Sequence, residues 1–333
     1  MVNLHIPVSV LNLVPIRQGQ TTKHAIDSMV SLAQAVEKLG YIRFWIAEHH
    51  NTTTLVSSAT SILIKHTLEH TNTIRVGSGG VMLPNHSPLV VAEQFGTMET
   101  IYPQRVDLGL GRAPGTDMMT ASALRRAQND SVYTFPDDVQ TLLTYLGPEE
   151  EQGYVCAFPG TGTNIPIYIL GSSTESAYLA AKLGLPYVFA SHFAPRYMEE
   201  AMTIYRSHFK PSKYLDQPYM MVCLNVIAAE TDEEAKYLST STAQFFLNVV
   251  RNARMPLQPP VENIDTLWNP MEKEAVASMS SVSFIGSKDS IRRQFTAFQE
   301  RYQVDEVMAV SYIYDENKQM RSYEILKEVA DGK

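Results

Sequence analysis

The chain of 333 residues contains only two cysteines, Cys156 and Cys223, with neither a CxxC pair nor the spacing of zinc ligands. This scarcity excludes a disulfide framework and favours a reducing, cytoplasmic compartment. No run of about 18 apolar residues occurs, so we expect no transmembrane helix. Residues 1–16 are apolar but have no lysine or arginine before them, which argues against a secretory signal.

Positive charge is also scarce. The 27 Lys and Arg residues face 35 Asp and Glu, which gives a formal net charge of −8, and no Lys/Arg-rich run occurs. These features argue against a nucleic-acid-binding surface. A hydrophobic content of 44% and a charged content of 19% are typical of a globular protein with a full core. The length fits one large α/β barrel or two ordinary domains.

Two phosphate-binding signatures are missing. The chain has no Walker lysine motif, and the glycines Gly109, Gly111 and Gly115 are spaced one residue too far apart for the dinucleotide fingerprint. Pro114 also disturbs the helix that should follow the glycines. A nicotinamide dinucleotide held on a Rossmann unit is therefore unsupported.

Apolar strand patterns alternate with helical patterns along the chain. The residues 21–39, for example, repeat apolar side chains at helical spacing and end at Gly40. We expect eight strands, at residues 7–13, 42–47, 74–82, 105–110, 165–170, 186–190, 220–228 and 305–312. Eight strand–helix units predict a closed (β/α)₈ barrel, with a doubly wound open sheet as the alternative. No repeat or linker appears, so we expect one domain over residues 1–333.

Two stretches interrupt this alternation. Residues 113–164, after the fourth strand, contain helical patterns near 120–126 and 137–146, and we expect an insertion or an extended crossover there. Residues 254–283, after the seventh strand, are rich in Pro, Met and Asn. This long segment is the best candidate for a mobile lid over an active site.

Chemically unusual residues follow the predicted strand ends, where such barrels place their active sites. Glu48 and His49 follow the second strand, Gly79 and Gly80 lie near the end of the third, and Arg112 follows the fourth. Glycine inside a strand marks a bulge or a close approach of the backbone to another body. We favour a large ligand across these strand ends over a role of the glycines in packing alone.

The run Glu48-His49-His50 has more than one interpretation. Such histidines often satisfy local backbone groups or bind metal, but metal-binding barrels usually gather more His and Asp ligands from other strand ends. His86 and His192 are the other histidines at strand ends here. We therefore expect no metal site and keep a metal hydrolase as a minor hypothesis. A neutral histidine acting as proton acceptor is the commoner use of this position, and we assign it to His49, with Glu48 beside it.

The helix after the fifth strand begins with the polar run Gly171, Ser172, Ser173, Thr174, Glu175 and Ser176. Ser172 and Glu175 fit a capping box, which needs no ligand. The same helix start, with its exposed N–H groups and the hydroxyls of Ser172, Ser173 and Ser176, is also suited to an anion. Arg112 could supply a fixed positive charge for a phosphate. Glu175 would repel a phosphate, so we expect it to turn outward or to cap the backbone.

Several of these segments together resemble the bacterial luciferase-like flavin monooxygenases. They are FWIAEHHN at 44–51, RVGSGGVMLPNH at 75–86, RVDLGLGRAPG at 105–115 and GLP at 184–186. The segments occur in the family's order, and the resemblance covers about residues 7–312. It implies a (β/α)₈ barrel that binds reduced FMN or, in some branches, the deazaflavin F420.

The resemblance also implies roles for individual residues. His49 corresponds to the active-site histidine near the reactive carbon of the flavin, and the Gly79–Gly80 peptide to a non-proline cis bond that packs against the ring. Arg112 and the helix start with Ser172, Ser173 and Ser176 match the phosphate site. The implied chemistry is reaction of reduced FMN with O₂ to a peroxyflavin that oxygenates a small organic substrate. A separate NAD(P)H reductase would supply the reduced flavin.

The sequence departs from luciferase at two points. Gly111 stands where luciferase has a reactive cysteine, and Gly79 and Gly80 stand where it has alanines, so we do not expect light emission. The alternatives are an F420-dependent oxidoreductase that transfers hydride and a non-catalytic flavin-binding protein. The presence of Glu48 and His49 argues against the second.

The helix expected over residues 89–102 is apolar on more than one face. We expect its second face, with the helix over residues 57–69, to bury against another copy in a two-fold homodimer, as in members of the family.

Overall fold

Eight parallel strands close into a barrel in the computed structural model, which describes residues 5–113, 117–124 and 134–333. The barrel strands are β1 (Val8–Asn12), β2 (Arg43–Ile46), β3 (Arg75–Met82), β4 (Val106–Gly111), β5 (Ile167–Gly171), β6 (Tyr187–Ala190), β7 (Met220–Ala229) and β9 (Glu306–Val310). The β6–β7 and β9–β1 pairings complete the circle. The predicted (β/α)₈ barrel is confirmed, while the single-domain interpretation stays a prediction.

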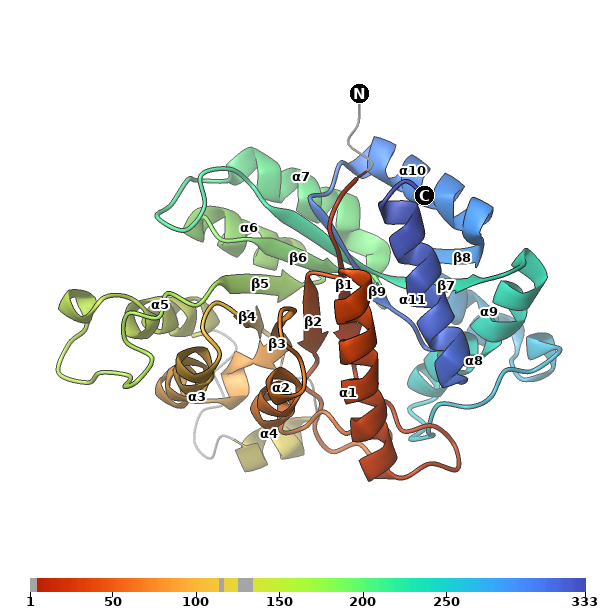
Figure 1. The fold of residues 1–333 in the computed structure, drawn as a ribbon, viewed down its shortest axis with the longest axis horizontal. Coiled ribbons are helices and arrows are strands. Elements are labelled where there is room, and N and C mark those ends of the chain that lie inside the picture. The colour runs from red at the N-terminus through yellow and green to blue at the C-terminus, as the bar shows by residue number, and fades with distance from the viewer. Residues whose placement is uncertain (1–4, 114–116, 125–133) are drawn as a thin grey trace.

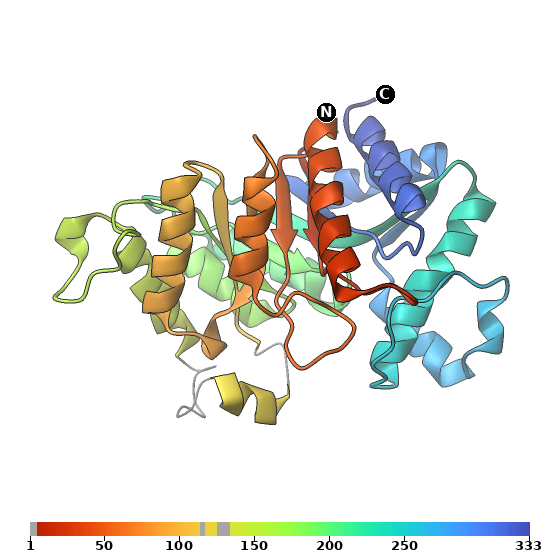
Figure 2. The ribbon, with the colours of Figure 1, turned by 60° about the horizontal axis from the view of Figure 1, so that its bottom comes forward.

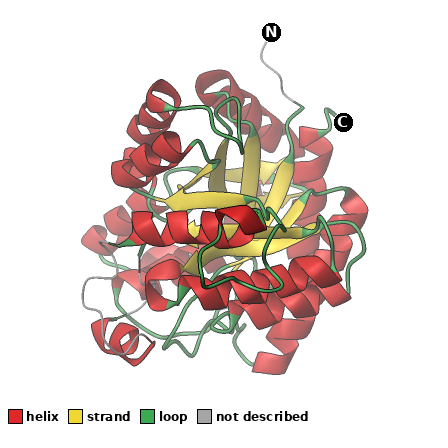
Figure 3. Cartoon of the chain, turned by 90° about the vertical axis from the view of Figure 1, so that its left-hand side faces the viewer, coloured by secondary structure: helices red, strands yellow, loops and turns green. Residues whose placement is uncertain are grey.

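Helices surround the barrel (Figures 1 and 3). They are α1 (Thr22–Leu39), α2 (Thr60–Glu69), α3 (Pro88–Ile101), α6 (Thr174–Leu183), α7 (Met198–His208), α8 (Asp232–Val250), α10 (Lys288–Tyr302) and α11 (Glu316–Ala330). Figure 2 shows α1, α2 and α3 side by side on the outside of the strands. Among the described residues, no helix has the length and apolar character needed to cross a membrane.

The boundaries of α1 follow from local chemistry. The Thr21 hydroxyl accepts a hydrogen bond from the His24 N–H at 3.2 Å and caps the first turn. Gly40 ends the helix with a φ of 82°, a left-handed conformation in which glycine has no steric penalty. The end predicted from the sequence is therefore confirmed.

The stretch between β4 and β5 is a long connection, as expected. It contains α4 (Met118–Leu124), α5 (Phe135–Leu146) and the 3₁₀ turn η2 (Glu149–Glu151). Its last part packs closely on α3, because a Cβ on Gly96 would lie 2.1 Å from the Cα of Gly160. Pro114, Gly115 and the end of the helical pattern at 125–126 lie outside the described residues.

The segment 254–283 contains more regular structure than the sequence indicated. It includes η4 (Ile264–Thr266) and α9 (Pro270–Met279), whose first turn is fixed by a capping box between Asn269 and Glu272. A ninth strand follows, β8 (Ser283–Ser287), which was not predicted because its five residues form no apolar run. Among the described strands it pairs with β7 alone, outside the barrel. Movement of this segment as a lid stays a prediction.

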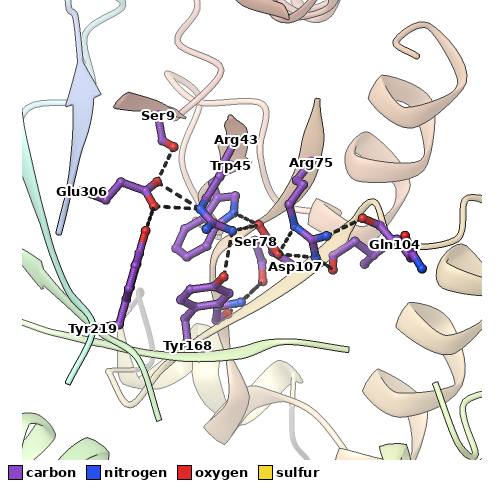
Figure 4. A network of polar contacts seen from close by, with 12 residues as sticks. Ser9, Arg43, Trp45, Arg75, Ser78, Gln104, Asp107, Tyr168, Tyr219 and Glu306 are labelled. Atoms are coloured by element: carbon purple, nitrogen blue, oxygen red, sulfur yellow. Dashed lines mark hydrogen bonds and ion pairs between the residues drawn. The ribbon is translucent and has the colours of Figure 1, made fainter. Parts of the chain in front are cut away.

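A network of charged and hydroxyl side chains fills the barrel interior near the starts of the strands (Figure 4). Asp107 and Glu306 are 0% exposed and share Arg43, which donates from Nη1 to Asp107 Oδ2 at 2.9 Å and from Nε to Glu306 Oε1 at 3.0 Å. Burial lowers the pKa of Arg43, but the two carboxylates outweigh it and raise the pKa above its usual value. Hydrogen bonds extend the network to Ser9, Trp45, Arg75, Tyr168 and Tyr219.

We predict that Asp107→Leu lowers the urea midpoint of unfolding strongly. The change removes the carboxylate that Arg43 and Arg75 share, and one partner of a buried ion pair is typically worth about 3–5 kcal/mol when it is lost. Lys65→Ala is the control, because Lys65 pairs with Glu69 on the exposed surface of α2 and should change the midpoint little. Equal midpoints for the two variants would show that the buried network adds nothing to stability.

Candidate active site

The parallel barrel brings the predicted site residues to one rim. Glu48 lies just beyond β2, Arg112 directly follows β4, and Gly171 is the last residue of β5. The Gly79–Gly80 peptide bond in β3 is cis, in agreement with what the family resemblance implied. All of these positions are at the C-terminal ends of parallel strands, where a barrel supports its chemistry.

Gly79 and Gly80 sit where β3 approaches its neighbours very closely. A Cβ on Gly79 would lie 2.4 Å from Leu11 Cδ1, and one on Gly80 would lie 2.7 Å from the Gly109 carbonyl oxygen. The register between β3 and β4 also shifts between Ser78 and Val81. Packing within the chain therefore accounts for both glycines, and their contact with a flavin stays a prediction.

Glu48 is the centre of a hydrogen-bonded cluster. It is 2% exposed, and its Oε1 lies 2.7 Å from both His50 Nε2 and His86 Nε2. The Met82 N–H donates to Oε2 at 3.1 Å. Burial raises the pKa of Glu48, but these hydrogen bonds outweigh burial and lower the pKa to about 2. Glu48 is thus a fixed carboxylate that ties the end of β2 to the segment after β3.

The same three side chains have the spacing of a metal site. The donor atoms of Glu48, His50 and His86 all lie within 4.8 Å of one another, a grouping of ligands that the sequence interpretation did not foresee. Their mutual hydrogen bonds already satisfy these atoms, so the arrangement needs no ion. The expectation of no metal stays a prediction.

A second group with ligand spacing lies on α2, outside the barrel, and consists of His66, Glu69 and His70. His66 and His70 also line an open hollow of about 680 Å³ between α1 and α2. Of the predicted site residues that the structure describes, none lines this hollow. We therefore place the candidate active site at the barrel rim and not in this hollow.

His49 is held at the rim as a neutral imidazole. Its backbone N–H donates to the Ser57 carbonyl at 3.1 Å, and its buried ring atom Nδ1 has no hydrogen-bond partner among the described residues. Burial lowers the pKa of His49 to about 4, although the nearby Glu48 carboxylate opposes this shift. A neutral imidazole with an open nitrogen can accept a proton or a hydrogen bond from a ligand.

His192, just after β6, belongs to the same site. It is 7% exposed, its Nδ1 is also without a partner in the described part of the chain, and burial lowers its pKa to about 3. A positive charge on His49 would lower the pKa of His192 further, so the two imidazole rings are close enough to interact electrostatically. The sequence marked His192 only as a possible metal ligand, because its burial beside His49 depends on the closed barrel.

The helix start after β5 differs from the predicted capping box. The N-cap of α6 is Ser173 and not Ser172, because the helix begins one residue later than the box requires. Ser176 faces inward: its hydroxyl donates to the Ser173 carbonyl at 2.7 Å and lies 2.9 Å from Tyr187 Oη. Ser172 and Ser173 remain partly exposed, so these two residues and the helix N–H groups are the accessible anion donors.

Arg112 lies beside this helix start. Its Nη2 is 3.9 Å from Glu175 Oε2, with the two side chains 41% and 64% exposed. The Glu175 side chain turns outward, one of the two arrangements expected, and hydrogen bonds from its own backbone N–H and the Ser173 hydroxyl lower its pKa. A phosphate at the helix start would take the place of Glu175 as the partner of Arg112.

Aromatic side chains cover the other side of the rim. Tyr312, just after β9, stacks on Phe245 of α8 with ring centroids 4.3 Å apart, and Phe246 contacts the same tyrosine edge-on. Trp268, from the segment after α8, packs against the same apolar cluster. These residues carry no sequence motif, so only the fold identifies them as part of the site.

Comparison with known proteins relates the whole chain to one family. The family model described as luciferase-like monooxygenase matches residues 6–303. A relative from Escherichia coli (strain K12), named luciferase-like monooxygenase, is 45% identical over 331 residues, with 99% of each chain covered. The N-acetyl-S-alkylcysteine monooxygenase of Bacillus subtilis (strain 168) is 29% identical over 331 residues, or 97% of this chain and 98% of the relative.

Solved structures share the same fold. The crystal structure of apo-MsnO8 has a TM-score of 0.90 and 33% identity, with 98% of each chain covered. The oxygenating constituent of 3,6-diketocamphane monooxygenase from Pseudomonas putida, solved with FMN, has a TM-score of 0.70 at 16% identity and covers 100% and 99% of the two chains. An F420-dependent secondary alcohol dehydrogenase has a TM-score of 0.68 at 14% identity, covering 98% and 99%. At these low identities, the last two matches show the fold alone.

We predict that acid destabilises the protein through its buried neutral histidines. The pKa of His192 is about 3 when folded, against 6.5 for an ordinary histidine, so the unfolded chain binds more protons between these values. Stability from this group is complete above pH 6.5 and falls as the pH approaches 3. From pH 7 to 4.5 the loss should be about 2–3 kcal/mol, and His192→Phe should remove it. Urea unfolding at several pH values measures this, with the exposed-residue variant His208→Phe as control; an unchanged acid slope in His192→Phe would contradict the assignment.

Proposed function

The chain belongs to the luciferase-like monooxygenase family, and on that premise we propose that it is an FMN-dependent monooxygenase. It would use reduced FMN and O₂ to oxygenate a small organic substrate. The observation that carries the proposal is a neutral His49 whose buried Nδ1 has no hydrogen-bond partner among the described residues, on the same rim as Arg112 and the start of α6. His49 can contact the reactive ring of one flavin mononucleotide, and Arg112 with the start of α6 can bind its phosphate.

The phosphate would bind between Arg112 and the start of α6. Backbone N–H groups, the positive end of the helix dipole and a guanidinium are a good match for a phosphate dianion. Ser172 and Ser173 would add hydroxyl donors, whereas Ser176 would support the turn from inside through Tyr187. The isoalloxazine ring would then lie across Gly79 and Gly80 toward His49.

His49 would act as the base or hydrogen-bond partner at the reactive edge of the ring. Glu48 would have a positioning role, because its hydrogen bonds to His50 and His86 hold the end of β2 in place. The oxygen chemistry would be supplied by the bound flavin. The aromatic cover with Phe245 and Tyr312 would keep water away from it.

An F420-dependent hydride transfer is the alternative, because one structural neighbour is an F420-dependent dehydrogenase. Its 14% identity is much lower than the 45% of the E. coli relative named as a monooxygenase, which favours oxygenation. A non-catalytic flavin-binding protein is disfavoured, since its pocket would not need a buried histidine whose Nδ1 has no partner in the described part of the chain.

We also propose a homodimer, a flavin reductase as the source of reduced FMN, and a cytoplasmic location. Ile62 on α2 is 67% exposed, and Val90 and Ile101 on α3 are 44% and 54% exposed, which supports contact with a second copy through these helices. Cys156 and Cys223 are both unpaired, as a reducing compartment would allow.

Arg112→Ala should weaken the binding of FMN far more than that of riboflavin. Only FMN carries the phosphate, and one charge-assisted contact is worth roughly 1.5–3 kcal/mol, or about 10- to 150-fold in affinity. Fluorescence titration of both flavins measures the two constants. Arg292→Ala, a change of an exposed arginine on α10, serves as the control. Equal losses for FMN and riboflavin would make Arg112 a structural residue.

The proposed reaction is tested by oxygen uptake with reduced FMN, beside hydride exchange with reduced F420. We expect the full chain to turn over reduced FMN and O₂ with members of a panel of small uncharged organic compounds. His49→Ala should slow this reaction about 10²- to 10⁴-fold while FMN still binds. Hydride exchange with F420 and no oxygenated product from FMN would reject the proposal. An early melt of His49→Ala with an unchanged rate would assign His49 to packing.

A further inference from the structure

Six buried side-chain polar atoms have no hydrogen-bond partner among the described residues, and three of them belong to residues after β2, after β6 and in β7. These three are His49 Nδ1, His192 Nδ1 and Asn225 Oδ1. Proteins pair about nine-tenths or more of their buried polar atoms, so each exception requires a reason. Ligands bound at the rim, the flavin and the substrate, explain these three.

The three residues lie close together at the rim. Alternate residues of a strand point to the same side, and Cys223 of β7 belongs to the apolar cluster inside the barrel, so Asn225, two residues further along β7, also points inward. The Asn225 amide contacts the His192 carbonyl, and His49 follows the end of β2. His192 lies within electrostatic reach of His49, as the effect of a charge on His49 on its pKa indicates.

Asn225 is held so that its acceptor oxygen stays available. Its Nδ2 donates to the His192 carbonyl at 2.7 Å and to Ser283 Oγ at 3.4 Å. A carbonyl can only accept, so the amide nitrogen must face it and Oδ1 must point elsewhere. Asn225 therefore joins the segment after β6 to the start of β8 while it offers one acceptor to a ligand.

The chemistry of this space is polar but uncharged. Burial lowers the pKa of His49 to about 4 and that of His192 to about 3, so both rings are neutral near pH 7. An amide oxygen such as Asn225 Oδ1 requires a donor from its ligand. The nearby aromatic pair, Phe245 and Tyr312, suits an apolar body attached to that donor group.

We propose that His192 and Asn225 recognise the polar end of the substrate, and this inference rests on the proposed function. Asn225 Oδ1 accepts a hydrogen bond from an N–H or O–H of the substrate, and His192 contacts the same group through Nδ1. The substrate class is an uncharged amide or alcohol with an apolar body, and carboxylates are excluded because no charge on these residues would pair with them. His192 and Asn225 determine specificity, while His49 faces the flavin.

Three matched probes test the substrate class by calorimetric titration of the FMN-loaded full chain. Benzamide is neutral and has N–H donors, N,N-dimethylbenzamide has lost the donors, and benzoate carries a charge. We expect benzamide to bind at least about tenfold more tightly than either of the others, the effect of one good hydrogen bond. Equal binding of benzamide and N,N-dimethylbenzamide, or no binding of any probe, overturns the proposal.

Variants then assign the contact. His192→Phe and Asn225→Leu should each weaken benzamide about tenfold and leave the affinity for FMN within about threefold. Ser311→Ala is the matched control, because Ser311 Oγ is also buried without a partner in the described residues, but Ser311 follows β9 and its carbonyl accepts a hydrogen bond from Gln319 of α11. If both variants weaken FMN instead, or if FMN displaces benzamide, the groups belong to the flavin and the inference fails.

If the proposed function is wrong, FMN does not bind to the wild-type chain. The three probes are then titrated against the cofactor-free protein. A preference for benzamide there still supports recognition by His192 and Asn225. The comparison of probes on the wild-type chain needs no variant, so it decides the question even if a variant does not fold.

Discussion

The barrel depends on one shared cation. Arg43 lies between Asp107 and Glu306, and these three side chains tie β2 to β4 and β9 inside the barrel (Figure 4). A buried ion pair adds little net stability over an apolar core, but removal of one partner is costly, so such a network can enforce one arrangement of strands. The network lies at the N-terminal ends of the strands, where its polar contacts fill the barrel interior. The candidate active site lies at the opposite, C-terminal ends.

At the C-terminal ends of the strands, the polar side chains fall into two sets. The first set forms hydrogen bonds within the protein, and the second has atoms without a partner among the described residues. Glu48 is saturated by His50, His86 and a backbone N–H, and Ser176 is occupied by the Ser173 carbonyl and Tyr187. His49, His192 and Asn225 instead keep buried atoms without partners in the described part of the chain. Arg112 forms a long contact of 3.9 Å with an exposed Glu175, which a phosphate could replace. The first set is expected to hold the rim in shape, and the second to bind flavin and substrate.

Patterns among neighbouring residues in the sequence were sufficient to predict the barrel architecture. Gly40 marked the end of α1, and the apolar runs predicted all eight barrel strands, because their periodicity depends on near neighbours. The Arg43–Glu306 contact joins residues 263 positions apart, so no local pattern could reveal it. The capping box at Ser172 was wrong by one residue, and the short β8 was missed because its pairing with β7 creates it. The burial that makes His192 neutral likewise exists only after the barrel closes.

A crystal structure of the full chain with bound FMN tests the central claim most directly, which is that this rim binds the flavin. The account predicts the phosphate within hydrogen-bond distance of Arg112 and the first N–H groups of α6, with Glu175 displaced. It also predicts the ring against Gly79 and Gly80, with its reactive edge toward His49. A flavin bound elsewhere, with the Arg112–Glu175 contact intact and His49 still without a partner, would contradict the account.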